Sequence, residues 1–461
     1  MTIAEKIADK IVHSRYDDLP AEAVHWAKVA ILDTLGVTVA GSVEPLAKIV
    51  KQVLTEEGGN PECTVLGLGN KTSPLSAVWA NGVLSHALDY DDISNTMGGH
   101  PSVPVIPALL ALSEQHSISG KAFVLAYVVG FETECKIGRS VNFVHYDRGW
   151  HPTSTLGIFG AAAAAAKLLG LAAADCARAL AIAASMASGI KANFGTMTKP
   201  LHVGQAARNG LLATLLASKG FSANLEALEA KQGFCNVFNG EQQYRLEAMT
   251  ERWGDPFDLV RPGVAIKQYP CCGSTHSAID ALLSLVQSRN LKPENTLSVI
   301  AAIHPRRLVH VNQPSPKTAL EGKFSIQYCL ARSLLDRKVV LGHFTDNAVC
   351  DPRVGEIMER IEVVPHAGMD WKSTEHYGAE VNVKLRSGEK FKAFQQKALG
   401  RGPDIPLPQS LLRAKFLDCW SQVYSRAAGE DLIAKVEALE TLADTRTLLE
   451  SFSVARDLQP T

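Results

Sequence analysis

Helical periodicity carried by small side chains runs through the first half of the chain and limits the possible folds most. Nearly every periodic segment up to about Arg261 has the apolar spacing of a helix; examples are residues 21–39, 75–89, 103–116, 121–139, 159–169, 175–188 and 204–219. Many of these positions are alanine or glycine, which let helix axes approach closely. We therefore predict a bundle whose helices are buried on several sides.

The pattern changes after Pro262. Residues 298–303 and 361–364 are short, apolar and rich in β-branched side chains, and residues 379–394 alternate with a period of two around a Ser387-Gly388 turn, which predicts a hairpin. Two helices are expected near 274–289 and 324–335. A chain of 461 residues is too long for one compact core, so we predict a second, smaller α+β domain over residues 263–397.

A stretch rich in glycine and proline, residues 400–408, separates this domain from two more helical segments, 409–427 and 432–452. We expect these segments to pack on the first domain, so that residues 398–461 complete the helical domain formed by residues 1–262. No repeat of fixed period and no low-complexity tail interrupts this organisation.

Charge and hydropathy exclude two classes of partner. The net charge is −1, so the molecule has no overall field that would attract nucleic acid or an anionic membrane. The most apolar region, residues 156–189, contains Lys167, Asp175 and Arg178 and lacks the run of about 20 apolar residues that a bilayer requires. We predict that this region is protein core and that the chain binds neither nucleic acid nor membrane.

Nine cysteines at irregular spacing, several of them within apolar helical segments, do not form a disulfide framework. The amino-terminal residues have an amphipathic helical pattern and lack the features of a secretory signal. We therefore expect reduced, mostly buried thiols and a cytoplasmic location.

Several cofactor motifs are missing. Gly67-Leu68-Gly69 is not followed by the third glycine of a dinucleotide fingerprint, and no phosphate-binding loop, Gly-x-Ser-x-Gly elbow or Cys-x-x-Cys pair occurs. Cys271, Cys272 and His276 form an incomplete ligand set. We predict no cofactor and no metal.

One local design occurs four times: a loop that carries histidine or lysine runs directly into an apolar helix. The four stretches are residues 89–102, 149–155, 198–208 and 267–276. A helix start presents unpaired N–H groups and the positive end of the helix dipole, so it is a natural site for a carboxylate. If the four stretches converge, they form a cationic pocket with several histidines.

Such a pocket suits acid–base chemistry on a polycarboxylate, because removing a proton next to a carboxylate creates charge that lysine, histidine and helix N–H groups stabilise. Simpler interpretations exist for each motif. His-Pro-Ser/Thr is adequate helix capping, His276 can be a core histidine, and the aspartates at 89, 91 and 92 can be a solvated helix end rather than a buried pair with one raised pKa.

The same motifs resemble the MmgE/PrpD family along nearly the whole chain. The stretches that carry the resemblance are Gly99-His-Pro-Ser, Gly149-Trp-His-Pro-Thr, Lys199-Pro-Leu-His-Val-Gly-Gln-Ala-Ala-Arg-Asn-Gly, Lys267-x-Tyr-Pro-Cys-Cys-Gly-x-x-His and Gly322-Lys-Phe-Ser-Ile-Gln-Tyr. The family includes 2-methylcitrate dehydratase, cis-aconitate decarboxylase and iminodisuccinate epimerase. The resemblance implies a mainly α fold, a large all-helical domain with a smaller α+β lid domain, an active site between them, no metal, and a homodimer.

Carried over residue by residue, the resemblance implies catalytic roles for Asp91 or Asp92, His100, His151, Lys199 and His276. Substrate-binding candidates are Lys267, His202, Thr96, Tyr146 and Arg208. Two departures from the family pattern bear on the reaction. Dehydratase-like members have a threonine soon after the aspartates, where this chain has Ile93-Ser94-Asn95-Thr96. The Asp-Ala pair that is usual in the family is replaced here by Glu321-Gly322.

We expect a metal-independent enzyme that abstracts a proton next to a carboxylate of a small di- or tricarboxylate. A hydro-lyase resembling 2-methylcitrate dehydratase is the first expectation. Alternatives are an epimerase of a dicarboxylate such as iminodisuccinate, a decarboxylase of the cis-aconitate type, and, more remotely, a non-catalytic binding protein.

Overall fold

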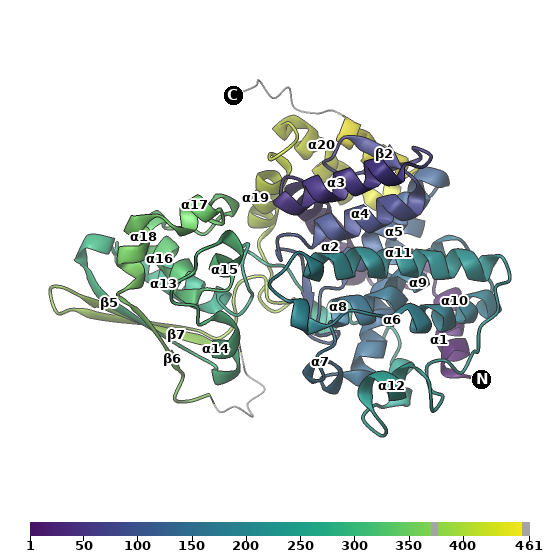
Figure 1. Cartoon of the computed structure of the whole chain (residues 1–461), viewed down its shortest axis with the longest axis horizontal. Coiled ribbons are helices and arrows are strands. Elements are labelled where there is room, and N and C mark those ends of the chain that lie inside the picture. Colours follow the sequence, from purple (N-terminus) through teal and green to yellow (C-terminus); the bar gives the residue numbers. More distant parts are fainter. Residues whose placement is uncertain (370–376, 454–461) are drawn as a thin grey trace. The chain divides into compact units, whose positions relative to one another are not determined.

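The computed structural model describes residues 1–369 and 377–453 and divides the chain into two compact units (Figure 1). Unit 1 comprises Met1–Ile266 and Gln409–Thr461, and unit 2 comprises Lys267–Pro408. The chain therefore leaves the first unit once and returns to it, as the composition of residues 400–408 suggested. The predicted limits of the smaller domain, 263–397, fall slightly before the breaks in the structure.

Unit 1 is built almost entirely of helices. They are α1 (Ile3–His13), α2 (Ala21–Gly41), α3 (Pro45–Glu57), α4 (Pro74–Ser85), α5 (Ser102–Gln115), α6 (Gly120–Val141), α7 (Val144–Asp147), α8 (Pro152–Thr155), α9 (Gly157–Leu168), α10 (Ala173–Met186), α11 (Thr198–Ser218), α12 (Phe234–Asn239), α19 (Gln409–Trp420), α20 (Arg426–Glu437) and α21 (Arg446–Glu450).

Small side chains set the spacing of the central helices, as predicted. The alanine-rich α9 packs against α5, α6 and α11, and α11 packs against α4. Gly82 of α4 lies so close to α11 that a Cβ atom there would be 2.7 Å from the Cα of Gly204. A side chain at either position would force the two helices apart, and closely packed interiors tolerate added volume poorly.

Helix α2 meets the length and composition of a membrane span, but its most apolar window is 72% buried in the structure. It packs against α4, α6 and α19, and it contains the buried Asp33. These contacts identify α2 as a core helix of unit 1. The sequence analysis had treated the later segment 156–189 as the most apolar one; that segment is also core, as α9 and α10.

Unit 1 also contains two short two-stranded sheets, which the prediction of an all-helical domain did not include. Strands β1 (Cys63–Val65) and β2 (Asn70–Thr72) form one of them. Strands β3 (Ile93–Ser94) and β4 (Val264–Ala265) form the other, with Ile93 opposite Ala265. The second pair fixes the middle of the loop that carries the aspartates to a segment more than 160 residues away in the sequence.

Unit 2 is an α+β domain, as predicted. It contains strands β5 (Thr296–Ile303), β6 (Ile361–Pro365), β7 (Ala379–Leu385) and β8 (Lys390–Gln395) and helices α13 (His276–Ser288), α14 (Pro305–Val311), α15 (Ala319–Lys323), α16 (Ile326–Asp336), α17 (Asp346–Val349) and α18 (Pro352–Met358). The chain is thus mainly helical with a small mixed sheet, and this confirms the predicted fold class.

The four strands form one mixed sheet in the order β6-β5-β7-β8. Strand β5 pairs in parallel with β6 and antiparallel with β7, and β7 and β8 form the predicted hairpin, in which Val381 lies opposite Ala393. Helix α13 packs against β7 and β8, and α16 packs against β6. The alternate residues Ala379, Val381 and Val383 are buried, which is the cause of the period of two in the sequence.

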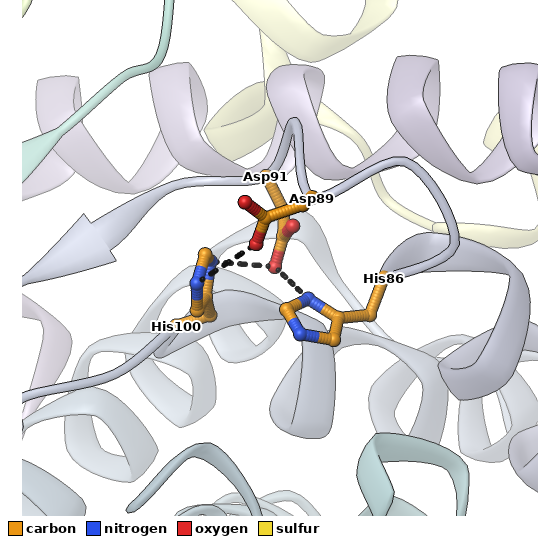
Figure 2. Close-up of side chains that lie close together, drawn as sticks. All are labelled: His86, Asp89, Asp91 and His100. Atoms are coloured by element: carbon orange, nitrogen blue, oxygen red, sulfur yellow. Dashed lines mark hydrogen bonds and ion pairs between the residues drawn. The ribbon is translucent and has the colours of Figure 1, made fainter. Parts of the chain in front are cut away.

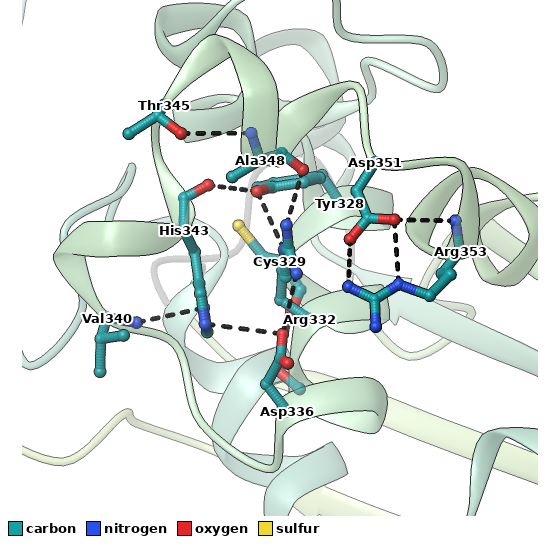
Figure 3. Close-up of polar contacts among 11 residues, drawn as sticks. Tyr328, Cys329, Arg332, Asp336, Val340, His343, Thr345, Ala348, Asp351 and Arg353 are labelled. Carbon is teal, nitrogen blue, oxygen red and sulfur yellow. Dashed lines mark hydrogen bonds and ion pairs between the residues drawn. The ribbon is translucent and has the colours of Figure 1, made fainter.

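A polar network holds the segment after α16 in place (Figure 3). Arg332 of α16 donates to the hydroxyl of Tyr328 at 3.1 Å, to the carboxylate of Asp336 at 3.0 Å and to the carbonyl of Ala348 at 2.6 Å. The hydroxyl of Tyr328 donates in turn to the carbonyl of His343. One buried guanidinium group therefore connects α17 and the loop before it to α16.

All nine cysteines lie among the described residues and are free thiols.

Candidate active site

The loop between α4 and α5 brings two histidines and three aspartates together in unit 1. His86 follows the last residue of α4, and His100 lies two residues before α5. Between these two histidines, β3 pairs with β4 and fixes the position of the loop. Asp89, in the same loop, adopts a left-handed backbone conformation with φ 53°. Gly99 allows the loop to lie against α8, because a Cβ atom there would be 2.7 Å from the backbone nitrogen of Thr153.

Asp91 is the centre of a His–Asp–His arrangement (Figure 2). Its Oδ2 lies 2.8 Å from Nδ1 of His86 and 3.0 Å from Nδ1 of His100. Nε2 of His100 lies 3.5 Å from Oδ1 of Asp89, and that same oxygen accepts a hydrogen bond from Nζ of Lys199 at 2.6 Å. One carboxylate therefore orients two imidazoles, while a second connects an imidazole to an ammonium group.

A second pair of histidines adjoins this arrangement. Nδ1 of His151 lies 3.1 Å from Nδ1 of His202, and the ring of His151 packs edge-on against Phe194 and lies 5.8 Å from the ring of His86. Four imidazoles and one ammonium group thus form a continuous cluster in unit 1. Nε2 of His86, Oδ1 of Asp91 and Nδ1 of His100 are buried and have no hydrogen-bond partner among the described residues, so the 3.0 Å contact between His100 and Asp91 is an ion-pair contact and not an aligned hydrogen bond.

Burial and neighbouring charge lower the pKa of three histidines of the cluster, His86, His151 and His202. Burial, together with the charges of Lys199 and His100, lowers the pKa of His86 to about 4 although Asp91 opposes the shift. Burial followed by the charges of its neighbours holds the pKa of His151 well below its ordinary value. Burial and then Lys199 lower the pKa of His202. These three imidazoles are therefore predominantly uncharged near neutral pH.

Asp91 and Asp92 are adjacent in sequence but have opposite electrostatics. Burial alone would raise the pKa of Asp91, but His100 and His86 outweigh it and bring that pKa well below its ordinary range. Burial, with added repulsion from Asp33 and Asp91, raises the pKa of Asp92 well above its ordinary range. Asp92 accepts hydrogen bonds from the hydroxyl and the backbone nitrogen of Ser102, so it caps α5 instead of contacting the histidines.

Three of the four predicted loop-to-helix motifs meet in this cluster. His100 precedes α5, His151 precedes α8, and Lys199 and His202 lie within the first two turns of α11. The last two residues are therefore part of a helix that begins at Thr198, earlier than the periodicity from 204 suggested. The fourth motif belongs to unit 2, where Nε2 of His276 lies 3.2 Å from the carbonyl of Cys271 and Lys267 is buried.

The contacts that define the cluster do not include three of the predicted binding residues. The carbonyl of Thr96 accepts from Asn142, and Thr96 lines a separate hollow of about 670 Å³. Tyr146 is covered by the ammonium group of Lys191, which lies 3.3 Å from its ring centroid. Arg208 follows Lys199 by nine residues on α11, so it lies about half a turn around that helix and on its opposite face.

Two members of the cluster were absent from the predicted site, His86 and Asp89. His86 lies outside the four loop-to-helix motifs, because it follows the last residue of the apolar helix α4. The signal that could have identified it is the density of polar groups within one short stretch, His86-Ala-Leu-Asp-Tyr-Asp-Asp92. Phe194, which packs on His151, is the other missed contact.

The ligand atoms of His86, Asp89, Asp91 and His100 lie within 4.8 Å of one another, so a divalent cation must be considered. Two observations count against it. The ammonium group of Lys199 lies 2.6 Å from Asp89, where it would repel the ion, and Nδ1 of His86 is directed at Asp91. The donor set therefore fits proton transfer better than metal binding.

The cluster predicts a loss of stability in acid. His86 has a pKa of about 4 in the folded protein and about 6.5 when unfolded, so the unfolded state binds the proton first as the pH falls. The free energy of unfolding should decrease by about 3 kcal/mol between pH 6.5 and pH 4 from this group alone. Asp91, whose pKa is lowered, extends the loss below pH 4.

Urea unfolding at several pH values measures this slope. The variant His86→Gln should lose about 3 kcal/mol of the pH dependence between 6.5 and 4, and the lowered pKa values of His151 and His202 should maintain the remainder. His116→Gln, which changes an exposed histidine at the far end of α5, should keep it. Equal slopes in His86→Gln and the unaltered protein would contradict a buried, neutral His86.

Comparison with known proteins identifies the family of the chain. The MmgE/PrpD N-terminal domain matches residues 5–247, and the MmgE/PrpD C-terminal domain matches residues 269–441. The chain is 33% identical to the cis-aconitate decarboxylase of Mus musculus over 97% of its own length and 92% of that protein. It is 32% identical to the cis-aconitate decarboxylase of Homo sapiens over 97% and 94%. It is 29% identical to that of Aspergillus terreus over 94% and 92%. The resemblance inferred from the motifs is therefore confirmed: the chain belongs to the MmgE/PrpD family.

Proposed function

We propose that this chain is a metal-independent lyase that decarboxylates a small unsaturated tricarboxylate of the cis-aconitate type. The single observation that carries the acid–base part is the cluster in which Asp91 orients His86 and His100 beside Lys199. The relatives named above supply the reaction type. They favour decarboxylation, which the sequence analysis held as an alternative, over the dehydration that it placed first.

Decarboxylation requires groups that bind carboxylates and a group that transfers a proton, and the cluster contains both kinds of group. When the bond between carbon and a carboxylate breaks, CO₂ leaves and the electron pair remains on carbon. In an unsaturated acid the double bond spreads this charge, and a proton delivered to carbon completes the product. The enzyme must therefore hold the remaining carboxylates and present a proton donor, while excluding water from the developing charge.

We base the roles of the cluster residues on how far each side chain is exposed. His86 and Asp91 have fully buried side chains, whereas the side chain of His100 is 12% exposed and that of Lys199 is 11% exposed. We assign proton transfer to His100, orientation of its ring to Asp91 and His86, and carboxylate binding to Lys199. His151 and His202 supply a second proton-transfer pair.

A substrate panel in D₂O tests the reaction type. cis-Aconitate, citrate, 2-methylcitrate and iminodisuccinate are incubated with protein dialysed with or without EDTA, and products are followed by NMR. The proposal expects CO₂ release from cis-aconitate, one deuterium on carbon in the product, and equal rates with and without chelator. Loss of water from a hydroxy acid would identify a dehydratase instead, and deuterium exchange with inversion would identify an epimerase. If no compound reacts, the proposed acid–base function is wrong.

Homodimerisation and a cytoplasmic location, which the sequence analysis expected, remain part of the proposal. Mass measurement in solution tests the first.

A further inference from the structure

Two arginines of unit 2 converge on one tyrosine ring. The guanidinium carbon of Arg401 lies 3.9 Å from the ring centroid of Tyr377, and that of Arg307 lies 4.7 Å from the same centroid. None of these residues belongs to a motif that the sequence analysis identified. The three are separated by up to 94 positions in the chain.

The topology of the sheet explains why they meet. Arg307 lies in α14, directly after β5, and Tyr377 lies two residues before β7. Strands β5 and β7 are antiparallel with Ile303 opposite Ala379, so the end of β5 adjoins the start of β7. Strand β8 ends beside the same point, with Gln395 opposite Ala379, and Arg401 follows it. The three side chains therefore come from one end of the sheet.

Part of each guanidinium group is buried without a hydrogen-bond partner among the described residues. Nε of Arg307 and Nε of Arg401 are both buried and have no hydrogen-bond partner among the described residues. The carboxylate of Asp280 in the same unit is engaged with the hydroxyl of Tyr269 at 2.5 Å and the backbone nitrogen of Leu399 at 2.9 Å.

Two other arginines of unit 2 are paired with carboxylates (Figure 3). Arg332 pairs with Asp336 at 3.0 Å, and Arg353 pairs with Asp351 at 2.8 Å. Burying a polar N–H group without a partner is costly, and burying two cations side by side adds repulsion. The arginine pair therefore differs from its neighbours in a way that packing alone does not explain.

Electrostatics supports the same conclusion. Burial alone would raise the pKa of Tyr377, but the charges of Arg401 and Arg307 outweigh it and lower that pKa. Burial, and then repulsion from Arg307 despite Tyr377, lowers the pKa of Arg401. A buried positive field of this kind favours any anion that can reach it.

We propose that Arg307 and Arg401 form a carboxylate-binding site in unit 2, with Tyr377 holding the two guanidinium groups in place. A guanidinium offers a planar fork of N–H donors that matches a carboxylate, and two forks can hold both of its oxygens. The identity of the ligand as a polycarboxylate rests on the proposed function. The existence of an anion site rests only on the arginine pair.

Direct binding tests the site without turnover. The probe is tricarballylate, a saturated tricarboxylate that has neither the double bond nor the hydroxyl group required for reaction, titrated into the full-length protein by calorimetry. Each of Arg307→Gln and Arg401→Gln should raise the Kd about 10- to 100-fold, because a hydrogen bond to a charged group is lost. Arg401→Lys keeps the positive charge but not the planar pair of N–H donors, so it should raise the Kd by an intermediate factor. This variant also provides a test if the glutamine variants misfold.

Arg353→Gln is the matched control, because Arg353 is an exposed arginine of the same unit that is paired with Asp351. It should bind like the unaltered protein. Unchanged Kd values in Arg307→Gln, Arg401→Gln and Arg401→Lys would overturn the site. A titration with inorganic phosphate that bound more tightly at the same arginines would overturn the carboxylate assignment.

The two proposals fail in different ways. If the carboxylate site is wrong but the proposed function is right, the glutamine variants turn over cis-aconitate with an unchanged KM. If the proposed function is wrong but the site is right, no substrate of the panel reacts, yet tricarballylate still binds and its binding still depends on Arg307 and Arg401.

Discussion

Replacing His100 with glutamine is expected to lower kcat on the accepted substrate by about 10²- to 10⁴-fold, which is the usual contribution of a positioned acid or base. The reason is geometric. His100 is the partly exposed imidazole of the pair that Asp91 orients, and both of its ring nitrogens face carboxylates, at 3.0 Å and 3.5 Å. Glutamine keeps hydrogen-bonding capacity but cannot transfer a proton.

The measurement is steady-state kinetics over a range of pH. KM should change much less than kcat at each pH, because Lys199 still binds the substrate carboxylate. His116→Gln serves as the control, since it changes an exposed histidine at the other end of the same helix. Activity of His100→Gln within a few-fold of the unaltered protein would exclude His100 as the proton donor.

The parts of this site that follow from local sequence were predictable. His100, His151 and Lys199 each stand at the start of a helix, and capping residues and glycines mark such starts in the sequence. The hairpin of β7 and β8 was predictable for a similar reason, because alternate burial of Val381 and Val383 produces a period of two. In both cases a few neighbouring residues contain the whole signal.

The parts that depend on tertiary structure were not predictable. Asp91 and Asp92 are adjacent, and only the fold shows that the first contacts the histidines while the second caps α5. Arg208 shares a motif with Lys199 but projects from the opposite face of α11. Arg307 and Arg401 lie far apart in sequence and meet only because the end of β5, the start of β7 and the end of β8 lie at the same end of the sheet. Register and helix face cannot be obtained from motif spacing.

Replacing Lys415 with methionine is expected to reduce the free energy of unfolding by about 3–5 kcal/mol, the usual effect of breaking a buried ion pair. Lys415 lies on α19, in the segment that returns to unit 1. Its ammonium group lies 2.6 Å from Oδ1 of Asp33 and donates to the carbonyl of Tyr90 at 2.8 Å. Both side chains are almost completely buried, at 4% and 1% exposed. The substitution leaves Asp33 charged and buried beside Asp92, which it already repels.

Urea unfolding measures the loss. Lys435→Met is the control, because Lys435 forms a partly exposed pair with Asp431 at 2.9 Å, and pairs of this kind contribute at most about 1 kcal/mol. The double variant Asp33→Leu with Lys415→Met should recover much of the stability, since two apolar side chains can replace a buried ion pair without leaving a charge behind. If Lys415→Met lowered the free energy of unfolding no more than Lys435→Met, the ion pair of Lys415 with Asp33 would not be buried as described.

The same substitution should also reduce activity in protein that remains folded. The carbonyl that Lys415 holds belongs to Tyr90, which lies between Asp89 and Asp91, and the ammonium group also lies 3.9 Å from the centroid of the Tyr90 ring. Without this contact the loop can shift, and Asp91 then orients His86 and His100 less well. We expect kcat to fall by about 10-fold or more at a temperature well below the unfolding transition, since small misplacements of reacting groups cost large factors in rate. A variant that loses stability but keeps full kcat would show that α19 supports the fold of unit 1 without positioning its acid–base cluster.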